Sequence, residues 1–124
     1  MQVITATEAP VFDIPGVRFT AYAAPSRGSA DVCAWRIRVA GELRSPQAHS
    51  LDADEVFLVL SGALRITPEG PVLSAGDCAI VPAGTPIQLV NPSAEEATAH
   101  VVVRAGFRAS MADGTSVGTP PWAQ

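Results

Sequence analysis

The chain alternates short apolar runs with turn-forming residues, a pattern typical of β-strands. Val, Ile, Phe and Thr fill the runs, and Gly, Pro, Asn and Ser interrupt them at short intervals. Signals for helices are almost absent. We therefore expect an all-β protein with strands over Val17–Ala24, Val32–Ala40, Glu55–Leu60, Ala63–Thr67, Cys78–Val81, Thr85–Val90 and Ala97–Arg104.

The alternation within one of these strands predicts which of its faces is buried. Arg36 and Arg38 lie on one face of the segment 32–40. Side chains of a strand alternate between its two faces, so the apolar residues between them share the opposite face. That face is expected in the core and consists of Cys33, Trp35, Ile37 and Val39.

The strand at 55–60 is apolar on both faces. Such a strand has one face in the core and the other covered by a second sheet or a second subunit. Val56, Leu58 and Leu60 form an outward row that a monomer would expose, so we expect a homodimer. Val17–Ala24 is the strand expected to lie at an open sheet edge and to pair with the partner.

The length of 124 residues fits a single domain, residues 1–124. We expect its core at about residues 30–105, preceded by N-terminal strands or an arm (1–29) and followed by an irregular tail (106–124). Phe107, Met111 and Trp122 indicate that part of this tail packs against the core.

The charge excludes several classes of function. The net charge is -4 and the chain has eight Arg and no Lys, so no basic surface is available for nucleic acid or an anionic membrane. The absence of Lys also excludes Schiff-base chemistry. No leader-like or membrane-spanning run is present, and we expect a cytoplasmic protein. Cys33 and Cys78 are isolated and form no metal or dithiol motif.

Gly76, Pro82, Gly84 and Asn91 are spaced as a Gly, five residues, Pro-x-Gly and a later Asn. This spacing resembles the second sequence motif of the cupin superfamily, which also has a His separated from the second Gly by two residues. Here Ile87 occupies the place of that His. Gly and Pro set the turns around a short strand, so their presence favours the cupin fold.

Glu55 and Gly62 match the second half of the first cupin motif, in which two His precede the Glu. Counting back from Glu55 places His49 at the first His and Leu51 at the second. Counting forward from Gly41 instead places Gln47 at the first and His49 at the second. We favour the first register because it preserves the spacing between His and Glu.

The resemblance implies an RmlC-like jelly roll of antiparallel strands, frequent dimers, and a pocket where three His and one Glu bind Fe, Mn, Zn, Ni or Cu. Leu51 and Ile87 donate no ligand atom, so we expect a degenerate metal site and no firmly bound cofactor. The alternative is a divalent transition metal held by atypical ligands, with His49, Glu55 and His100 as the candidates.

His49 and Glu55 are the candidate catalytic residues. In the favoured register both project into the barrel, where a lone carboxylate is costly, so we expect them to contact each other. The expected pocket walls are Gln47, Leu51, Trp35, Phe57, Val59 and Ile87.

These residues predict a cupin that binds a small organic molecule and acts as a metal-independent isomerase, cyclase or lyase. One alternative is a metal-dependent cupin, either an oxygenase or a metal-assisted isomerase. The other is a non-catalytic ligand-binding or sensor protein.

Overall fold

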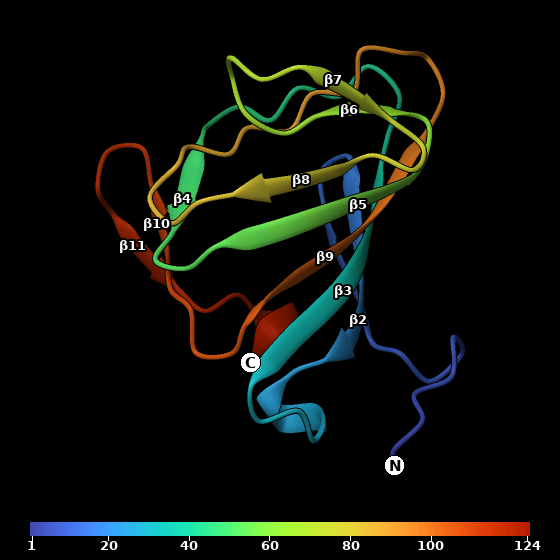
Figure 1. The fold of residues 1–124 in the computed structure, drawn as a ribbon, viewed down its shortest axis with the longest axis vertical. Coiled ribbons are helices and arrows are strands. Elements are labelled where there is room, and N and C mark those ends of the chain that lie inside the picture. The colour runs from blue at the N-terminus through green and yellow to red at the C-terminus, as the bar shows by residue number, and fades with distance from the viewer.

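The computed structural model describes residues 1–124, and its regular secondary structure is almost entirely β-strand (Figure 1). Each strand ends at a turn rich in Gly, Pro, Asp or Ser, as the punctuation of the sequence predicts. The elements are β1 (Val11–Ile14), β2 (Val17–Ala23), η1 (Pro25–Arg27), β3 (Val32–Val39), β4 (His49–Leu51), β5 (Glu55–Ser61), β6 (Ala63–Arg65), β7 (Val72–Ser74), β8 (Cys78–Val81), β9 (Ala97–Arg104), β10 (Ala109–Met111), β11 (Ser116–Gly118) and η2 (Pro121–Ala123).

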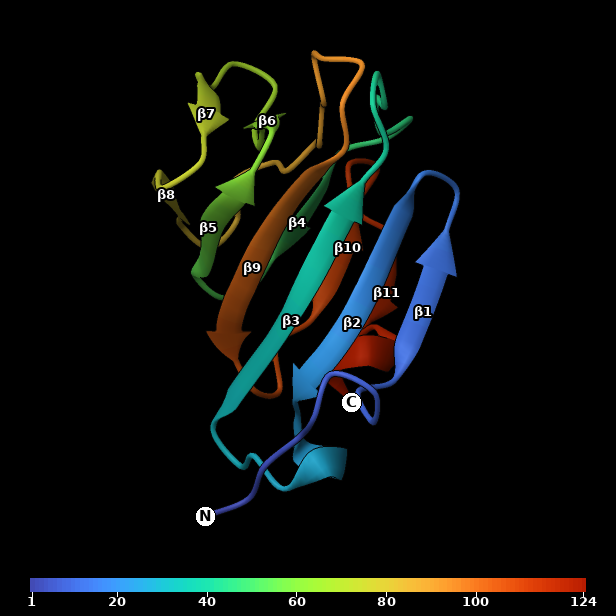
Figure 2. The ribbon, with the colours of Figure 1, turned by 90° about the vertical axis from the view of Figure 1, so that its right-hand side faces the viewer.

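The strands form two facing sheets and a hairpin. The large sheet has the order β1-β2-β3-β9-β5-β8, the small sheet has the order β11-β10-β4, and β6 pairs with β7. All pairs are antiparallel. Figure 2 shows the large sheet in front of β4, β10 and β11. The expected all-β antiparallel jelly roll is confirmed. Both helices are single 3-10 turns, and none of the helices is long and apolar enough to be a membrane span.

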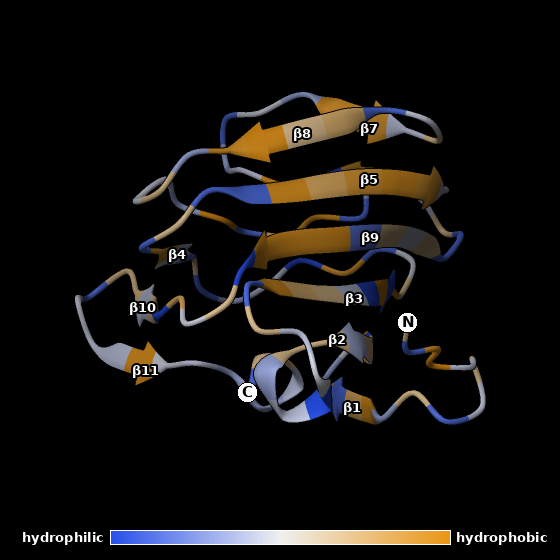
Figure 3. Ribbon diagram, turned by 60° about the horizontal axis from the view of Figure 1, so that its bottom comes forward, coloured by the Kyte–Doolittle hydropathy of each residue, from blue (hydrophilic) through white to orange (hydrophobic).

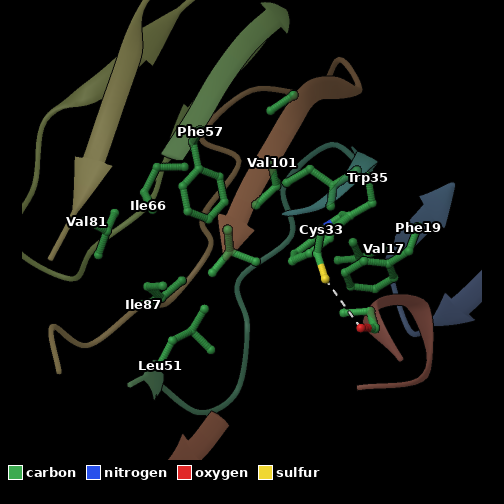
Figure 4. Close-up of a cluster of buried hydrophobic side chains, with 14 of the residues drawn as sticks. Val17, Phe19, Cys33, Trp35, Leu51, Phe57, Ile66, Val81, Ile87 and Val101 are labelled. Atoms are coloured by element: carbon green, nitrogen blue, oxygen red, sulfur yellow. Dashed lines mark hydrogen bonds between the residues drawn. The ribbon is translucent and has the colours of Figure 1, made fainter. Parts of the chain in front are cut away.

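The core lies between the two sheets. The expected inner face of β3 is confirmed, because Cys33, Trp35, Ile37 and Val39 are all buried. Figure 4 shows side chains of β2, β3, β5 and β9 converging from the large sheet. Most of β5, β8 and β9 is hydrophobic (Figure 3). The outward row of β5 is also present, with Leu58 40% and Leu60 45% exposed.

The prediction of a strand at Thr85–Val90 is wrong. This segment makes only isolated bridges, at Ile87 and Val90. The Ile87 N–H donates to the His49 carbonyl, whereas the Gln88 N–H donates to the Ile66 carbonyl on the other side. Pro86 has no N–H, so no continuous ladder forms. The strands that the sequence pattern missed are β1, β4, β7, β10 and β11, which have three or four residues each.

The prediction that Val17–Ala24 lies at a sheet edge is also wrong. A hairpin turn at Pro15–Gly16 folds β1 back onto β2, with Ile14 opposite Val17. Gly16 has a φ of +78°, a conformation that glycine adopts without strain. Because β3 pairs on the other side, β2 is an internal strand and β1 is the edge.

The C-terminal segment is more regular than expected, because it contains β10, β11 and η2. Trp122 stacks on Phe19 of β2, with ring centroids 3.8 Å apart. The Cys33 thiol donates to the Ala123 carbonyl, and the Arg27 guanidinium donates to the Trp122 carbonyl. Residues 107–123 therefore cover part of the inner face of the large sheet.

One motif glycine makes a testable contribution to this fold. Gly62 joins β5 to β6 with a φ of +76°, and a Cβ there would lie 2.7 Å from the Glu96 carbonyl oxygen. Gly76 has a φ of +92° but has no atom within 4 Å of such a Cβ. We expect Gly62→Ala to lower the free energy of unfolding by about 2 kcal/mol or more, and Gly76→Ala by about 1 kcal/mol. Urea unfolding measures both, and equal losses would contradict the backbone clash.

Candidate functional site

A cavity of about 340 Å³ lies between the two sheets. Residues of both sheets, of η2 and of the loops line it, and 15 of the 21 lining residues are hydrophobic. A cavity of this size is at the small end of the usual range for ligand pockets, roughly 300–1,000 Å³. Both His49 and Glu55 line it.

Glu55 is the most deeply buried ionisable side chain of the cavity. It begins β5, where the inward-facing position places it 4% exposed. Its Oε2 atom is buried and has no hydrogen-bond partner. Burial raises the pKa of this carboxyl to about 8, so at pH 7 it is predominantly the uncharged acid. An uncharged carboxylic acid can donate a hydrogen bond to a ligand.

His49 begins β4 and is half-buried. Its main chain is held by Ile87, since the His49 N–H donates to the Ile87 carbonyl at 3.0 Å and the His49 carbonyl accepts from the Ile87 N–H at 2.7 Å. Burial lowers the pKa of the imidazole, so the ring is uncharged at neutral pH. A neutral imidazole has one nitrogen that accepts a proton, as a general base requires.

The expected contact between His49 and Glu55 is not formed. No hydrogen bond or ion pair joins the two side chains. Since both groups are uncharged at neutral pH, no Coulomb attraction draws them together. The structure brings both groups to one cavity and leaves each available to a ligand.

The structure places most of the expected pocket walls at this cavity. Trp35, Phe57, Gln47, Leu51 and Ile87 line it. Figure 4 shows the Leu51 and Ile87 side chains beside each other, with Phe57 nearby. Val59 is buried but does not line the cavity, because it lies further along β5 opposite Ala99.

The residues present do not fit the metal site of three His and one Glu. Leu51 and Ile87 supply only carbon, and no group of three or more His, Cys, Asp or Glu is close enough to hold an ion. Gln47, His49 and Leu51 all face the cavity, so either register of the first motif leaves one imidazole on this segment. Two donors rarely retain a transition ion.

His100 does not join His49 and Glu55. Its neighbour Val101 faces the cavity, so strand alternation directs His100 to the outer face of the large sheet. There its ring meets the Tyr22 ring edge-on, with centroids 5.8 Å apart. The His100 imidazole therefore lies on the opposite side of the sheet from the cavity.

Sequence reasoning missed the part of the cavity wall that comes from β2, from Leu89 and from the C-terminal segment. The aromatic members are Phe19, Phe107 and Trp122, and Trp35 lies 6.1 Å from Phe107 between ring centroids. The isolated apolar residues of the tail signalled packing, but the surface they cover is distant in the sequence. The missed lining residues include Phe19, Leu89, Phe107, Met111 and Trp122.

Comparison with known proteins gives a family and several structural neighbours. A family profile described as "Cupin domain" matches residues 35–104. A sugar phosphate isomerase of a cupin superfamily from Silicibacter pomeroyi DSS-3 is 27% identical, with a TM-score of 0.65, over 80% of this chain and 67% of that chain.

Two further solved structures match nearly the whole chain. The polyketide cyclase RemF from Streptomyces resistomycificus has a TM-score of 0.74 at 14% identity, over 98% of this chain and 88% of its own. An RmlC-like cupin protein from Ralstonia eutropha JMP134 has a TM-score of 0.76 at 12% identity, over 98% of this chain and 79% of its own. At these identities the likeness shows the fold. No curated protein matches significantly.

The burial of Glu55 predicts how stability depends on pH. A carboxyl whose pKa is raised in the folded state contributes stability that is fully present below its unfolded pKa, 4.5, and is lost as the pH rises through about 8. We expect the free energy of unfolding to fall by several kcal/mol over this window, and Glu55→Gln to abolish most of the fall.

Urea unfolding of the wild-type protein and of Glu55→Gln across this pH range measures the fall in the free energy of unfolding. Glu69→Gln is the matched control, because Glu69 is exposed. A wild-type stability that stays constant, or falls equally in Glu55→Gln, would show that the folded protein holds Glu55 ionised.

Proposed function

The chain belongs to the cupin domain family, and on that premise we propose that it binds a small organic molecule between its two sheets and acts as a metal-independent isomerase, cyclase or lyase. One observation carries the proposal: a largely apolar cavity contains a single buried carboxyl group whose Oε2 atom has no protein partner. Buried polar groups are normally hydrogen-bonded, and an exception in a cavity is explained by a ligand that completes the bond.

The proposed chemistry is proton transfer between His49, Glu55 and the ligand. The neutral imidazole of His49 removes a proton from carbon, and the Glu55 acid donates a hydrogen bond or a proton to the adjacent oxygen. Isomerisation, ring closure by enol addition and elimination all proceed by such transfers. None of them changes the oxidation state of the protein or needs a metal.

A salicylate 1,2-dioxygenase is among the structural neighbours, but two other neighbours support this class of reaction. One is a sugar phosphate isomerase and another a polyketide cyclase. The phosphate of the first substrate does not suit this chain, because no Arg lines the cavity. The metal-dependent alternative is not supported by the donor set at Leu51 and Ile87. A binding protein without catalysis would use the same cavity and differs only in turnover.

We also propose that the protein is a homodimer. Four aliphatic side chains lie opposite one another across the outer face of the large sheet, in the order Ala34, Val102, Val56 and Ile80. Leu58 extends this outer apolar row, and Ile80 is 69% exposed. A contiguous apolar strip of this kind is typical of a surface that pairs with its own copy.

A cytoplasmic location and the lack of nucleic-acid and membrane partners stay predictions. They rest on the net charge of -4 and on the eight cationic residues of the chain, all Arg. Three of these Arg pair with surface carboxylates, Arg18 with Asp13, Arg38 with Glu96 and Arg104 with Asp52.

The proposed catalysis is tested with 2-tetralone, an apolar ketone whose α-protons exchange with solvent when it enolises. We expect the chelator-treated protein, shown by elemental analysis to hold less than one equivalent of any transition metal, to accelerate this exchange in D2O. Glu55→Gln and His49→Gln are each expected to slow it by about 100-fold or more. NMR follows the exchange.

Glu69→Gln is again the matched control and should exchange at the wild-type rate. Exchange that disappears on chelation and returns with an added divalent metal would support the metal-dependent alternative. No exchange above the uncatalysed rate would contradict the enzyme proposal and leave a binding protein.

The dimer is tested by a charge on the outer apolar row. Leu58→Glu is expected to convert the dimer into a monomer at micromolar concentration, because an unpaired carboxylate would be buried in the interface. Val72→Glu is the control, since Val72 is an exposed residue of β7, outside the large sheet. Light scattering measures both, and a monomeric wild-type protein would overturn the proposal.

A further inference from the structure

The lining of the cavity consists of a large apolar surface and a few polar residues. Aromatic rings reach the cavity from five different elements or loops, namely Phe19, Trp35, Phe57, Phe107 and Trp122. Surfaces of this kind favour flat, apolar ligands, because rings stack on rings and burial removes carbon from water. The cavity therefore suits a ligand whose main body is a ring system.

The polar lining residues come from the segment that leads into β4 and from the start of β5. Ser45, Gln47 and His49 alternate along a single segment that ends at the apolar Leu51. Gln47 is exposed and His49 half-buried, whereas Glu55 is almost fully buried, so polar groups extend from the mouth of the cavity to its interior. A ligand with one oxygenated edge and an apolar body meets both surfaces.

The cavity has no fixed positive charge. None of the eight Arg lines it, and His49 is the only lining side chain that can become cationic. A phosphate or sulfate placed there would be buried without a paired cation and close to the carboxyl of Glu55. Burying an unpaired charge is far more costly than burying a neutral polar group that is hydrogen-bonded.

We propose that the cavity selects uncharged ring compounds that carry a hydroxyl or carbonyl oxygen at one edge, and that it rejects their phosphate esters. The oxygen lies toward Glu55 and His49, and the rings lie between the aromatic walls. This inference rests on the proposed function, because it names the substrate class of the same cavity.

The test compares two probes with the same ring system, one a neutral hydroxyl compound and the other its charged phosphate ester. Isothermal titration calorimetry at pH 7, where Glu55 is predominantly the uncharged acid and the His49 imidazole is uncharged, measures the binding of 2-naphthol and of 2-naphthyl phosphate to the full chain. We expect 2-naphthol to bind at least tenfold more tightly. Equal affinities, tighter binding of the phosphate, or no measurable binding of 2-naphthol would overturn the proposal.

Two variants locate the binding and its selectivity. Ala109→Phe fills the cavity from β10 and is expected to lose 2-naphthol binding, whereas Ala83→Phe, at an exposed position outside the cavity, keeps it. Met111→Arg places a cation opposite His49 on the neighbouring strand and is expected to raise the affinity for 2-naphthyl phosphate at least tenfold. An unchanged affinity in folded Met111→Arg would contradict the charge argument, even where Ala109→Phe fails to fold.

The outcomes also separate this inference from the proposed catalysis. Selective 2-naphthol binding without α-proton exchange on 2-tetralone would support the ligand class and contradict the enzyme. Exchange accompanied by equal affinity for the naphthol and its phosphate would support the enzyme and contradict the ligand class.

Discussion

Water must be kept from the inner face of the large sheet, and the arrangement of the other elements follows from this requirement. That face is apolar from Val17 on β2 to Val81 on β8. The small sheet covers only part of it, because β4 and β10 have three residues each. The C-terminal segment covers more, with Trp122 on Phe19 and Ala123 beside Cys33. The cavity lies between these two covers and the large sheet.

Glu55 is the costly feature of this arrangement. A buried oxygen without a partner lowers stability, and burial keeps the carboxyl protonated at neutral pH. A ligand that accepts the hydrogen bond of Glu55 would offset this cost. The same feature that destabilises the ligand-free protein therefore favours binding, which is a common relation between stability and function at a site.

The two cupin motifs contain residues of two independent kinds. Gly62, Gly76 and Gly84 have positive φ at turns, and the Asn91 side chain donates to the carbonyls of Val39 and Glu95. These residues hold the backbone and are all present. The ion-binding positions depend instead on side-chain donors, and Ile87 shows that a donor can be replaced without loss of the turns around it. The turns of the second motif therefore form with Ile87 at the position of the His.

The sequence by itself determined the fold class, the family and the long strands. β2, β3, β5 and β9 were predicted because period-two alternation or apolar runs bounded by turns identify strands locally. It also indicated Glu55 and His49 as candidate site residues, because motif spacing is local too.

Only the tertiary structure decided which segments close the cavity, that His100 faces outward and that His49 and Glu55 stay unbonded. Strands as short as β4 and β10 contain too few alternations to be recognised. Contacts such as Trp122 on Phe19 join residues far apart in the chain. They depend on how the sheets pack, which no local pattern of residues specifies.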